Sequence, residues 1–220
     1  MGILEKILSF FFPPHCILCG KVVSADEVML CDAHLVCGDT FLRQEFALKT
    51  EAGSRKLRCM APAEYTGDLR KVLHRFKFKG ETSLAEPLAK YMSGCVSAAD
   101  FDCIVPVPIS ESRMKERGYN QSALLGKALS KMTGIPTAAY LKKVRNNMTQ
   151  HTLSKFEREK NVQGVYSAEA CSGMRVLLVD DIITTGATVK ECARTLLAAG
   201  AAEVTAISCA LVPAGSDSTQ

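Results

Sequence analysis

Residues 176–188 constrain the fold of this 220-residue chain more than any other segment. An apolar stretch at 175–179 is followed by Asp180 and Asp181, and a short Thr/Gly segment then leads into helical spacing. A continuously apolar strand is typical of a sheet that is covered on both faces. Because residues 204–212 form the next apolar strand, the strand–helix–strand order predicts a parallel α/β sheet. The two acids should then lie at the carboxyl end of a strand, where open α/β sheets bind their ligands.

The Thr/Gly segment 184–188 has the composition of an anion-binding loop. Backbone N–H groups of the loop and helix start, together with the hydroxyls of Thr184, Thr185 and Thr188, can bind a phosphate. Gly186 lets the backbone approach a ligand closely. Two carboxylates beside this loop can accept hydrogen bonds from sugar hydroxyls, so the segment suits a ribose 5-phosphate. The alternative is an ordinary βα turn in which a threonine caps the helix and the acids are solvated.

This motif resembles the phosphoribosyl pyrophosphate (PRPP) motif of type I phosphoribosyltransferases. The resemblance implies that Asp180 and Asp181 hold the ribose 2′ and 3′ hydroxyls, and that residues 184–188, Ala187 included, bind the 5-phosphate. It also implies that Mg²⁺ binds with PRPP and that a nitrogen nucleophile displaces pyrophosphate. Thr184 stands where purine-salvage members have an acid, so a carboxylate that would contact a base is missing there.

Two further stretches resemble the signature of the ComF (competence protein F) family of predicted phosphoribosyltransferases. One comprises residues 105–108 and 113–121, and the other comprises residues 150–166. Tyr119 and Tyr166 stand where Phe is usual in the family. The resemblance implies a parallel sheet of the type I phosphoribosyltransferase kind and, as a function, transfer of a phosphoribosyl group to an unknown nitrogen acceptor.

Arg113 and Arg117 follow the strand-like stretch 103–109 and are candidates for the pyrophosphate side of the site. A guanidinium group can donate paired hydrogen bonds to phosphate oxygens. Arg117 joins Asp180 and Asp181 as a candidate catalytic residue. The alternative for each arginine is a solvated surface charge.

The polar stretch between the next two strands contains Gln150, Arg158 and Asn161. We expect it to act as a flap that closes over the site and excludes water from a cationic transition state. The alternative is a plain exposed loop.

Cys16, Cys19, Cys31 and His34 have the spacing of a zinc ribbon. The pairs Cys16/Cys19 and Cys31/His34 can supply four ligands to a tetrahedral metal ion. A site whose four ligands all come from the protein is structural rather than catalytic. The ComF resemblance supports one structural Zn²⁺, with Cys37 as an alternative ligand. The competing interpretations are incidental buried cysteines and a redox dithiol.

The composition divides the chain into three parts. We expect a Cys-rich, zinc-ribbon-like module at 1–60, ending after the polar stretch 51–54, and a phosphoribosyltransferase-like α/β domain at 61–213. Residues 214–220 are small and polar and are expected to form a disordered tail.

The overall composition argues against several classes of protein. The formal net charge of +4 is far from that of a dedicated nucleic-acid binder. The chain has no apolar run of about 18 residues, so no membrane span is expected. The ten cysteines are mostly scattered through apolar patterns, which fits a reducing cytosol and a cytoplasmic location. The apolar stretch at 7–12 is short and lacks a cleavage site, which argues against a signal peptide.

Residues 69–80 interleave basic and aromatic side chains. Such a segment could bind single-stranded DNA weakly, with its aromatic rings as stacking platforms, or it could be an amphipathic helix with a solvated basic face. The ComF resemblance adds a role in DNA uptake (competence), with a helicase or ATPase as a candidate partner. Three functions remain open: a PRPP-dependent transferase, a non-catalytic PRPP sensor and a DNA-uptake accessory protein. The acid pair and both arginines favour the transferase.

Overall fold

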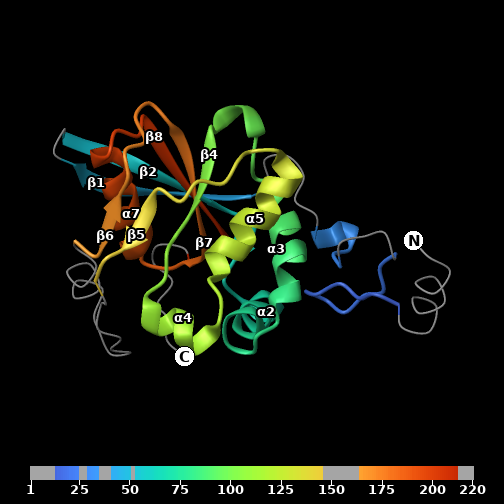
Figure 1. Ribbon diagram of the computed structural model, residues 1–220. Helices are drawn as coiled ribbons and strands as arrows, with labels where there is room; N and C mark the ends of the chain where they lie inside the picture. Colours follow the sequence, from blue (N-terminus) through green and yellow to red (C-terminus); the bar gives the residue numbers. More distant parts are fainter. Residues whose placement is uncertain (1–12, 25–28, 35–40, 51–52, 146–163, 213–220) are drawn as a thin grey trace.

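The computed structural model describes residues 13–24, 29–34, 41–50, 53–145 and 164–212. Its centre is a six-stranded sheet in the order β1-β2-β8-β7-β4, with β3 paired to β8 beside this path (Figure 1). The β1–β2 pair is antiparallel and the other pairs of this sheet are parallel. The strands are β1 (Leu42–Thr50), β2 (Gly53–Ala61), β3 (Ala63–Glu64), β4 (Cys103–Pro106), β7 (Arg175–Ile183) and β8 (Glu203–Leu211). The helices are α2 (Gly67–Phe78), α3 (Ala85–Ser93), α4 (Glu111–Arg117), α5 (Gln121–Thr133) and α7 (Ala187–Ala198).

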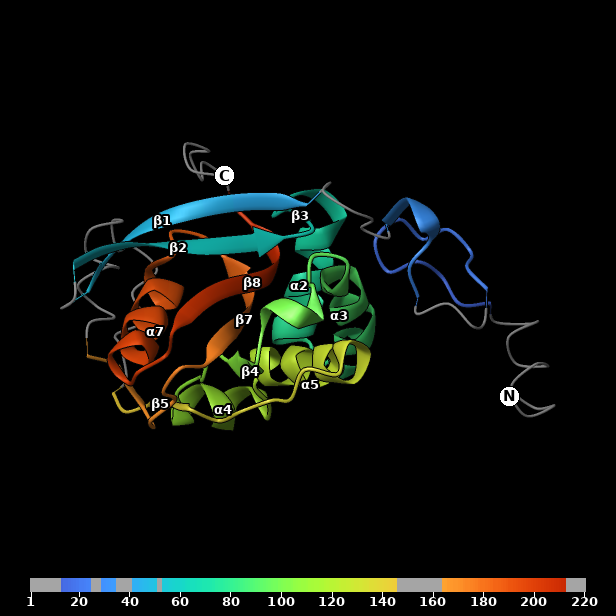
Figure 2. The ribbon, with the colours of Figure 1, turned by 90° about the horizontal axis from the view of Figure 1, so that it is seen from above.

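Two helical layers cover the sheet, with α2, α3 and α5 on one face and α7 on the other (Figure 2). Successive residues of β7 point to opposite faces, as the pleat of a strand requires. Leu177 and Val179 join the core under α2, α3 and α5, whereas Val176 and Leu178 join the core under α7. Both sets are buried, which explains the continuous apolar run. The predicted α/β fold is confirmed.

Strand β7 carries the two aspartates within its paired region. Asp180 still pairs with Ser208 of β8, whereas β4 ends at Pro106 opposite Val179. Strand β7 is therefore longer than the expected 175–179. At Asp180 and Asp181 it extends beyond the end of β4, its neighbour on the other side. Space opens beside β7 at this point.

The hairpin of β1 and β2 belongs to the main sheet. β2 pairs with β8 from Arg58 to Met60, so the boundary expected at residue 60 falls inside this sheet. The polar stretch 51–54 joins two strands of one hairpin rather than two domains, because Thr50 pairs with Gly53 across it. We propose a boundary between the Cys/His cluster and Leu42 instead. The expected tail, 214–220, lies outside the described residues.

A second sheet consists of β5 (Leu141–Lys143) and β6 (Tyr166–Ala168), paired antiparallel. The flap candidates Gln150, Arg158 and Asn161 fall between these strands, outside the described residues. Across the ranges that are described, no helix has the length and apolar character needed to cross a membrane.

Candidate phosphoribosyl-binding site

A pocket of about 410 Å³ lies where β4 and β7 end. α2, the segment after β4, α4, the start of α5 and the β5–β6 sheet provide its walls together with β7. Its lining includes two acidic and four cationic side chains: Asp180, Asp181, Lys77, Arg113, Arg117 and Lys143. The structure therefore brings together the predicted aspartates and both predicted arginines. We call it the two-aspartate pocket.

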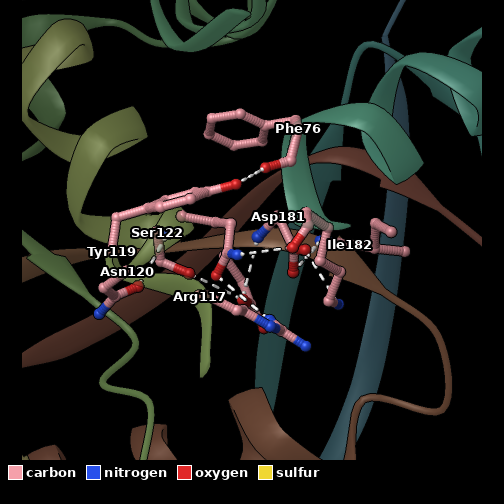
Figure 3. A network of polar contacts seen from close by, with 10 residues as sticks. Phe76, Arg117, Tyr119, Asn120, Ser122, Asp181 and Ile182 are labelled. Atoms are coloured by element: carbon pink, nitrogen blue, oxygen red, sulfur yellow. Dashed lines mark hydrogen bonds and ion pairs between the residues drawn. The ribbon is translucent and has the colours of Figure 1, made fainter. Parts of the chain in front are cut away.

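The two aspartates are held by directional hydrogen bonds (Figure 3). Asp180 Oδ1 accepts from Ser122 Oγ at 3.0 Å and from the backbone N–H of Asp181 at 2.9 Å. Asp181 Oδ1 accepts from the backbone N–H of Ile182 at 3.0 Å. The second oxygen of Asp181, Oδ2, lies 3.0 Å from Lys77 Nζ but has no hydrogen-bond partner among the described residues. Both carboxylates are thus fixed in place, with one buried oxygen left for a ligand.

The environment opposes ionisation of Asp180. Burial, and then the neighbouring charge of Asp181, raise the pKa of Asp180 to about 7, although Lys77 acts in the opposite direction. The ionised form of such a carboxylate is stabilised when a hydroxyl donor or a cation binds next to it. A perturbed pKa inside a pocket is also typical of functional sites.

The Thr/Gly loop meets the pocket through Thr184 and Thr188, which both line it. Thr185 Oγ1 accepts from the backbone N–H of Ala187 at 3.4 Å, but Thr185 precedes the N-cap position of the helix. Gly186 is the N-cap of α7, with a left-handed φ of 74°, and it offers no side-chain acceptor to the first turn. A helix start without such a cap is suited to binding an anion.

Arg113 and Arg117 lie one turn apart on α4 and both face the pocket. Arg117 donates to Gln121 Oε1 at 3.3 Å, and its guanidinium carbon lies 5.0 Å from the centre of the Phe78 ring. Its buried Nε has no hydrogen-bond partner among the residues described. Burial and the charge of Arg113 lower the pKa of Arg117. Two neighbouring cations with unused donors favour a polyanionic ligand.

Two lysines and a tyrosine of the pocket were not expected from the sequence. Lys77 comes from α2, in the segment interpreted as a basic amphipathic helix, and Lys143 and Tyr166 come from β5 and β6. Lys143 Nζ lies 5.5 Å from the centre of the Tyr166 ring. Burial, and then Arg113, lower the pKa of Lys143 to about 8. No local sequence signal distinguishes these lysines from surface lysines, because the fold alone brings them to the site.

The end of the signature stretch, from Tyr119 to Gln121, and the following Ser122 connect the walls of the pocket (Figure 3). Tyr119 donates its hydroxyl proton to the carbonyl of Phe76 in α2. Asn120 donates to the carbonyl of Val107, and its Oδ1 accepts from the backbone N–H of Ser122 at the start of α5. This stretch therefore places α2, α5 and the end of β4 around the aspartates.

The four predicted metal ligands form one cluster near the N-terminus. The ligand atoms of Cys16, Cys19, Cys31 and His34 all lie within 4.8 Å of one another. The separation of the Cys19 and Cys31 sulfurs is 3.7 Å, and Cys31 Sγ lies 3.2 Å from His34 Nδ1. Tetrahedral zinc with bonds of about 2.3 Å to sulfur places two sulfurs about 3.8 Å apart. The donor set and spacing therefore suit zinc; Cys37 lies outside the described residues.

Local hydrogen bonding favours the thiolate form of one of these ligands. Burial opposes ionisation of Cys16, but backbone hydrogen bonds involving Cys31, Cys19 and Leu18 lower the pKa of its thiol to about 6. The thiolate is the form that binds metal.

Comparison with known proteins agrees with this geometry. The model of the phosphoribosyl transferase domain matches residues 120–219. The chain is 31% identical to "Competence protein F" of Haemophilus influenzae over 92% of this chain and 86% of that protein. It is 35% identical to "DNA utilization protein YhgH" of Salmonella typhi over 67% of this chain and 69% of that protein. It is 31% identical to "Competence protein ComFC" of Bacillus subtilis over 85% of this chain and 73% of that protein.

Among solved structures, the glutamine PRPP amidotransferase from B. subtilis aligns with a TM-score of 0.43 and 24% identity. The alignment covers 76% of this chain and 37% of that chain.

The sheet, the two-aspartate pocket and the domain match define a phosphoribosyltransferase-type α/β domain, and a Cys/His cluster that could hold zinc lies near the N-terminus. Within that class, the chain belongs to the competence protein F (ComF) family.

Proposed function

We propose that the chain binds PRPP with Mg²⁺ in the two-aspartate pocket and transfers the phosphoribosyl group to a nitrogen nucleophile. The supporting observation is that paired carboxylates, a Thr/Gly helix start and four cationic side chains line one pocket. PRPP carries two ribose hydroxyls beside a phosphate and a pyrophosphate, so its polar groups complement this lining.

The proposed contacts follow the walls of the pocket. Asp180 and Asp181 accept hydrogen bonds from the ribose hydroxyls, and residues 184–188 bind the 5-phosphate. Arg113 and Arg117 face the pyrophosphate. The oxygen-rich ligand suits Mg²⁺, which would be held by the phosphate and sugar oxygens that the aspartates locate and would supply positive charge to the leaving group.

The proposed reaction forms a bond between nitrogen and the sugar C1 while the bond from C1 to the pyrophosphate oxygen breaks. The electron pair leaves with pyrophosphate, and the nitrogen loses its proton to solvent. Arg117 is partly buried and lines the pocket, so it can stabilise the developing negative charge with little reorganisation. The aspartates stabilise the cationic sugar and hold it in line.

A pyrophosphate-release assay with PRPP, Mg²⁺ and a panel of bases and amines tests the transferase. Release that depends on one acceptor and disappears in R117M supports it. Calorimetric binding of PRPP without release for any acceptor would favour the second candidate, a non-catalytic PRPP sensor.

The names of the relatives favour a role in DNA uptake, whether the protein is a transferase or a non-catalytic PRPP sensor. One is called a competence protein and another a DNA utilization protein. Within this proposal the protein is cytoplasmic, contains one structural Zn²⁺ in its N-terminal module, and serves DNA uptake through a helicase or ATPase partner or through weak binding of single-stranded DNA. Co-purification with a competence ATPase, before and after zinc removal, tests whether the module mediates such a contact.

A further inference from the structure

An ammonium group from outside the predicted motifs faces the aspartates. Lys77 Nζ lies 3.0 Å from Asp181 Oδ2, and the two side chains are 25% and 10% exposed. The contact has the distance of an ion pair, but Asp181 Oδ2 receives no directed hydrogen bond. The lysine therefore supplies charge to this oxygen while leaving its lone pairs available to a hydroxyl donor.

The position of Lys77 is fixed from both sides. Its own carbonyl accepts from Gln121 Nε2 at 3.3 Å, and the carbonyl of the preceding residue, Phe76, accepts from the Tyr119 hydroxyl. Phe76 is fully buried in the core. The end of α2 is thus held against the start of α5, whose Ser122 contacts Asp180. The same contacts that build the pocket deliver the lysine to it.

Several other charged or titratable groups surround the pair, but among the described residues Lys77 alone lies within ion-pair distance of either aspartate. The groups that face the aspartates from the neighbouring elements are His74 and Lys77 of α2, Arg113 and Arg117 of α4, Lys143 of β5, Tyr166 of β6, Cys192 of α7 and Cys209 of β8.

We propose that Lys77 is the internal counter-ion of the two-aspartate pocket, a positioning residue that keeps the carboxylates in the ionised form that accepts sugar hydroxyls. This inference rests on the proposed function for its ligand, but the role of the lysine itself concerns the empty pocket. When a diol occupies the aspartates, the ammonium is free to turn toward a phosphate oxygen of the same ligand. Lys77 would then contribute to both states without taking part in the chemical step.

The first test needs no ligand. The side-chain carboxyl carbon of Asp180 is followed by NMR as the pH is raised in wild type, K77M and K77R. Loss of the positive charge should raise the titration midpoint of Asp180 by about one pH unit in K77M, whereas K77R should stay near wild type. K79M is the matched control, because Lys79 is exposed, lies two residues further along and does not line the pocket. An unchanged midpoint in K77M would overturn the proposal.

The second test measures PRPP binding by calorimetry with Mg²⁺ between pH 6.5 and 9. K77M should bind about fivefold more weakly than wild type near pH 7, because a one-unit shift lowers the ionised fraction of Asp180 by that factor, and should recover most of the loss by pH 9. A loss that is equal at every pH in both K77M and K77R would mean a merely structural role, and would contradict the proposal. If wild type fails to bind PRPP, the proposed function fails, while the NMR titration still decides the role of Lys77.

Discussion

The ring of Phe46 lies only 2.8 Å from the position that a Cβ at residue 186 would occupy. Strand β1 therefore packs directly on the Thr/Gly loop. Gly186 also has a φ of 74°, a conformation that residues with a Cβ rarely adopt. The glycine is thus required by two independent constraints of the protein itself, besides any approach of a ligand.

Substitution G186A should destabilise the protein by about 2–4 kcal/mol. The left-handed backbone contributes about 1–2 kcal/mol and the overlap with the Phe46 ring contributes the remainder. Gly134 is the matched control, because its φ is 77° and nothing lies within 4 Å of the added Cβ. G134A should therefore cost about 1 kcal/mol in urea unfolding. Equal losses in the two variants would show that Phe46 yields without cost.

Substitution D181N should weaken PRPP binding in the presence of Mg²⁺ by about 1–3 kcal/mol. This is the scale for losing the charge on a hydrogen-bonded acceptor, and Asp181 Oδ2 is a buried oxygen that no described residue hydrogen-bonds. Calorimetry on folded protein measures it, with D68N as a control on an exposed aspartate of α2. An unchanged affinity in D181N would exclude this residue from ribose binding.

The raised pKa of Asp180 predicts how stability depends on pH. The native protein retains a proton on Asp180 up to about pH 7, whereas the unfolded chain loses it near its ordinary value of 3.8. Between these values the native state binds more protons, so this group makes the free energy of unfolding fall as pH rises. D180N removes the titration and should be more stable than wild type at pH 8 by about 1–2 kcal/mol, with little gain at pH 4. Urea unfolding at the two pH values measures the difference.

The parts of the fold that the sequence predicts best are those with one dominant local signal. The uniform apolar run predicts the start of β7 at residue 175, and the Thr/Gly segment 184–188 coincides with the start of α7. Strand β1 lacks such a signal. Its burial alternates between partly buried and exposed positions, with Leu48 as its single buried residue, but the polar Gln44 takes an inward position and the apolar Ala47 takes an exposed one, which weakens the alternation in the sequence.

The residues of the candidate site likewise fall into those that a local sequence signal reveals and those that only the fold brings together. The aspartates and the Thr/Gly loop are contiguous, so their chemistry is visible as a motif. Lys77 and Lys143 reach the pocket only because α2 and β5 pack beside β7, and nothing local marks them. The short polar links from Tyr119 and Gln121 to α2 are likewise a product of tertiary structure.

The Cys/His cluster predicts about one zinc ion per chain. Elemental analysis of protein purified without added metal should find it, and C19S or H34A should lower the stoichiometry and destabilise the N-terminal module, because binding energy is folding energy in such sites. C95A is the control, since Cys95 is buried but outside the cluster. Well-folded protein without zinc would instead favour the interpretation of these cysteines as ordinary buried residues.

The basic segment of α2 provides the last prediction, on single-stranded DNA. Three of its cations already have acidic partners: Lys71 pairs with Asp68 at 2.8 Å, Arg75 pairs with Glu81, and Lys77 pairs with Asp181. Each phosphate that a free cation neutralises releases a counterion and steepens the dependence of affinity on salt, so the paired cations should contribute little. With a net charge of only +4, we expect weak binding with a shallow slope.

A labelled oligonucleotide titrated at two salt concentrations measures that slope by fluorescence. Replacing Arg70, Lys71 and Arg75 with Gln should flatten it further while PRPP binding persists, because none of the three lines the two-aspartate pocket. Tight binding by wild type that survives the triple substitution would place the contact on another surface. Absence of binding even at low salt would make this face of α2 an ordinary solvated one, and a role in DNA uptake would then require a protein partner.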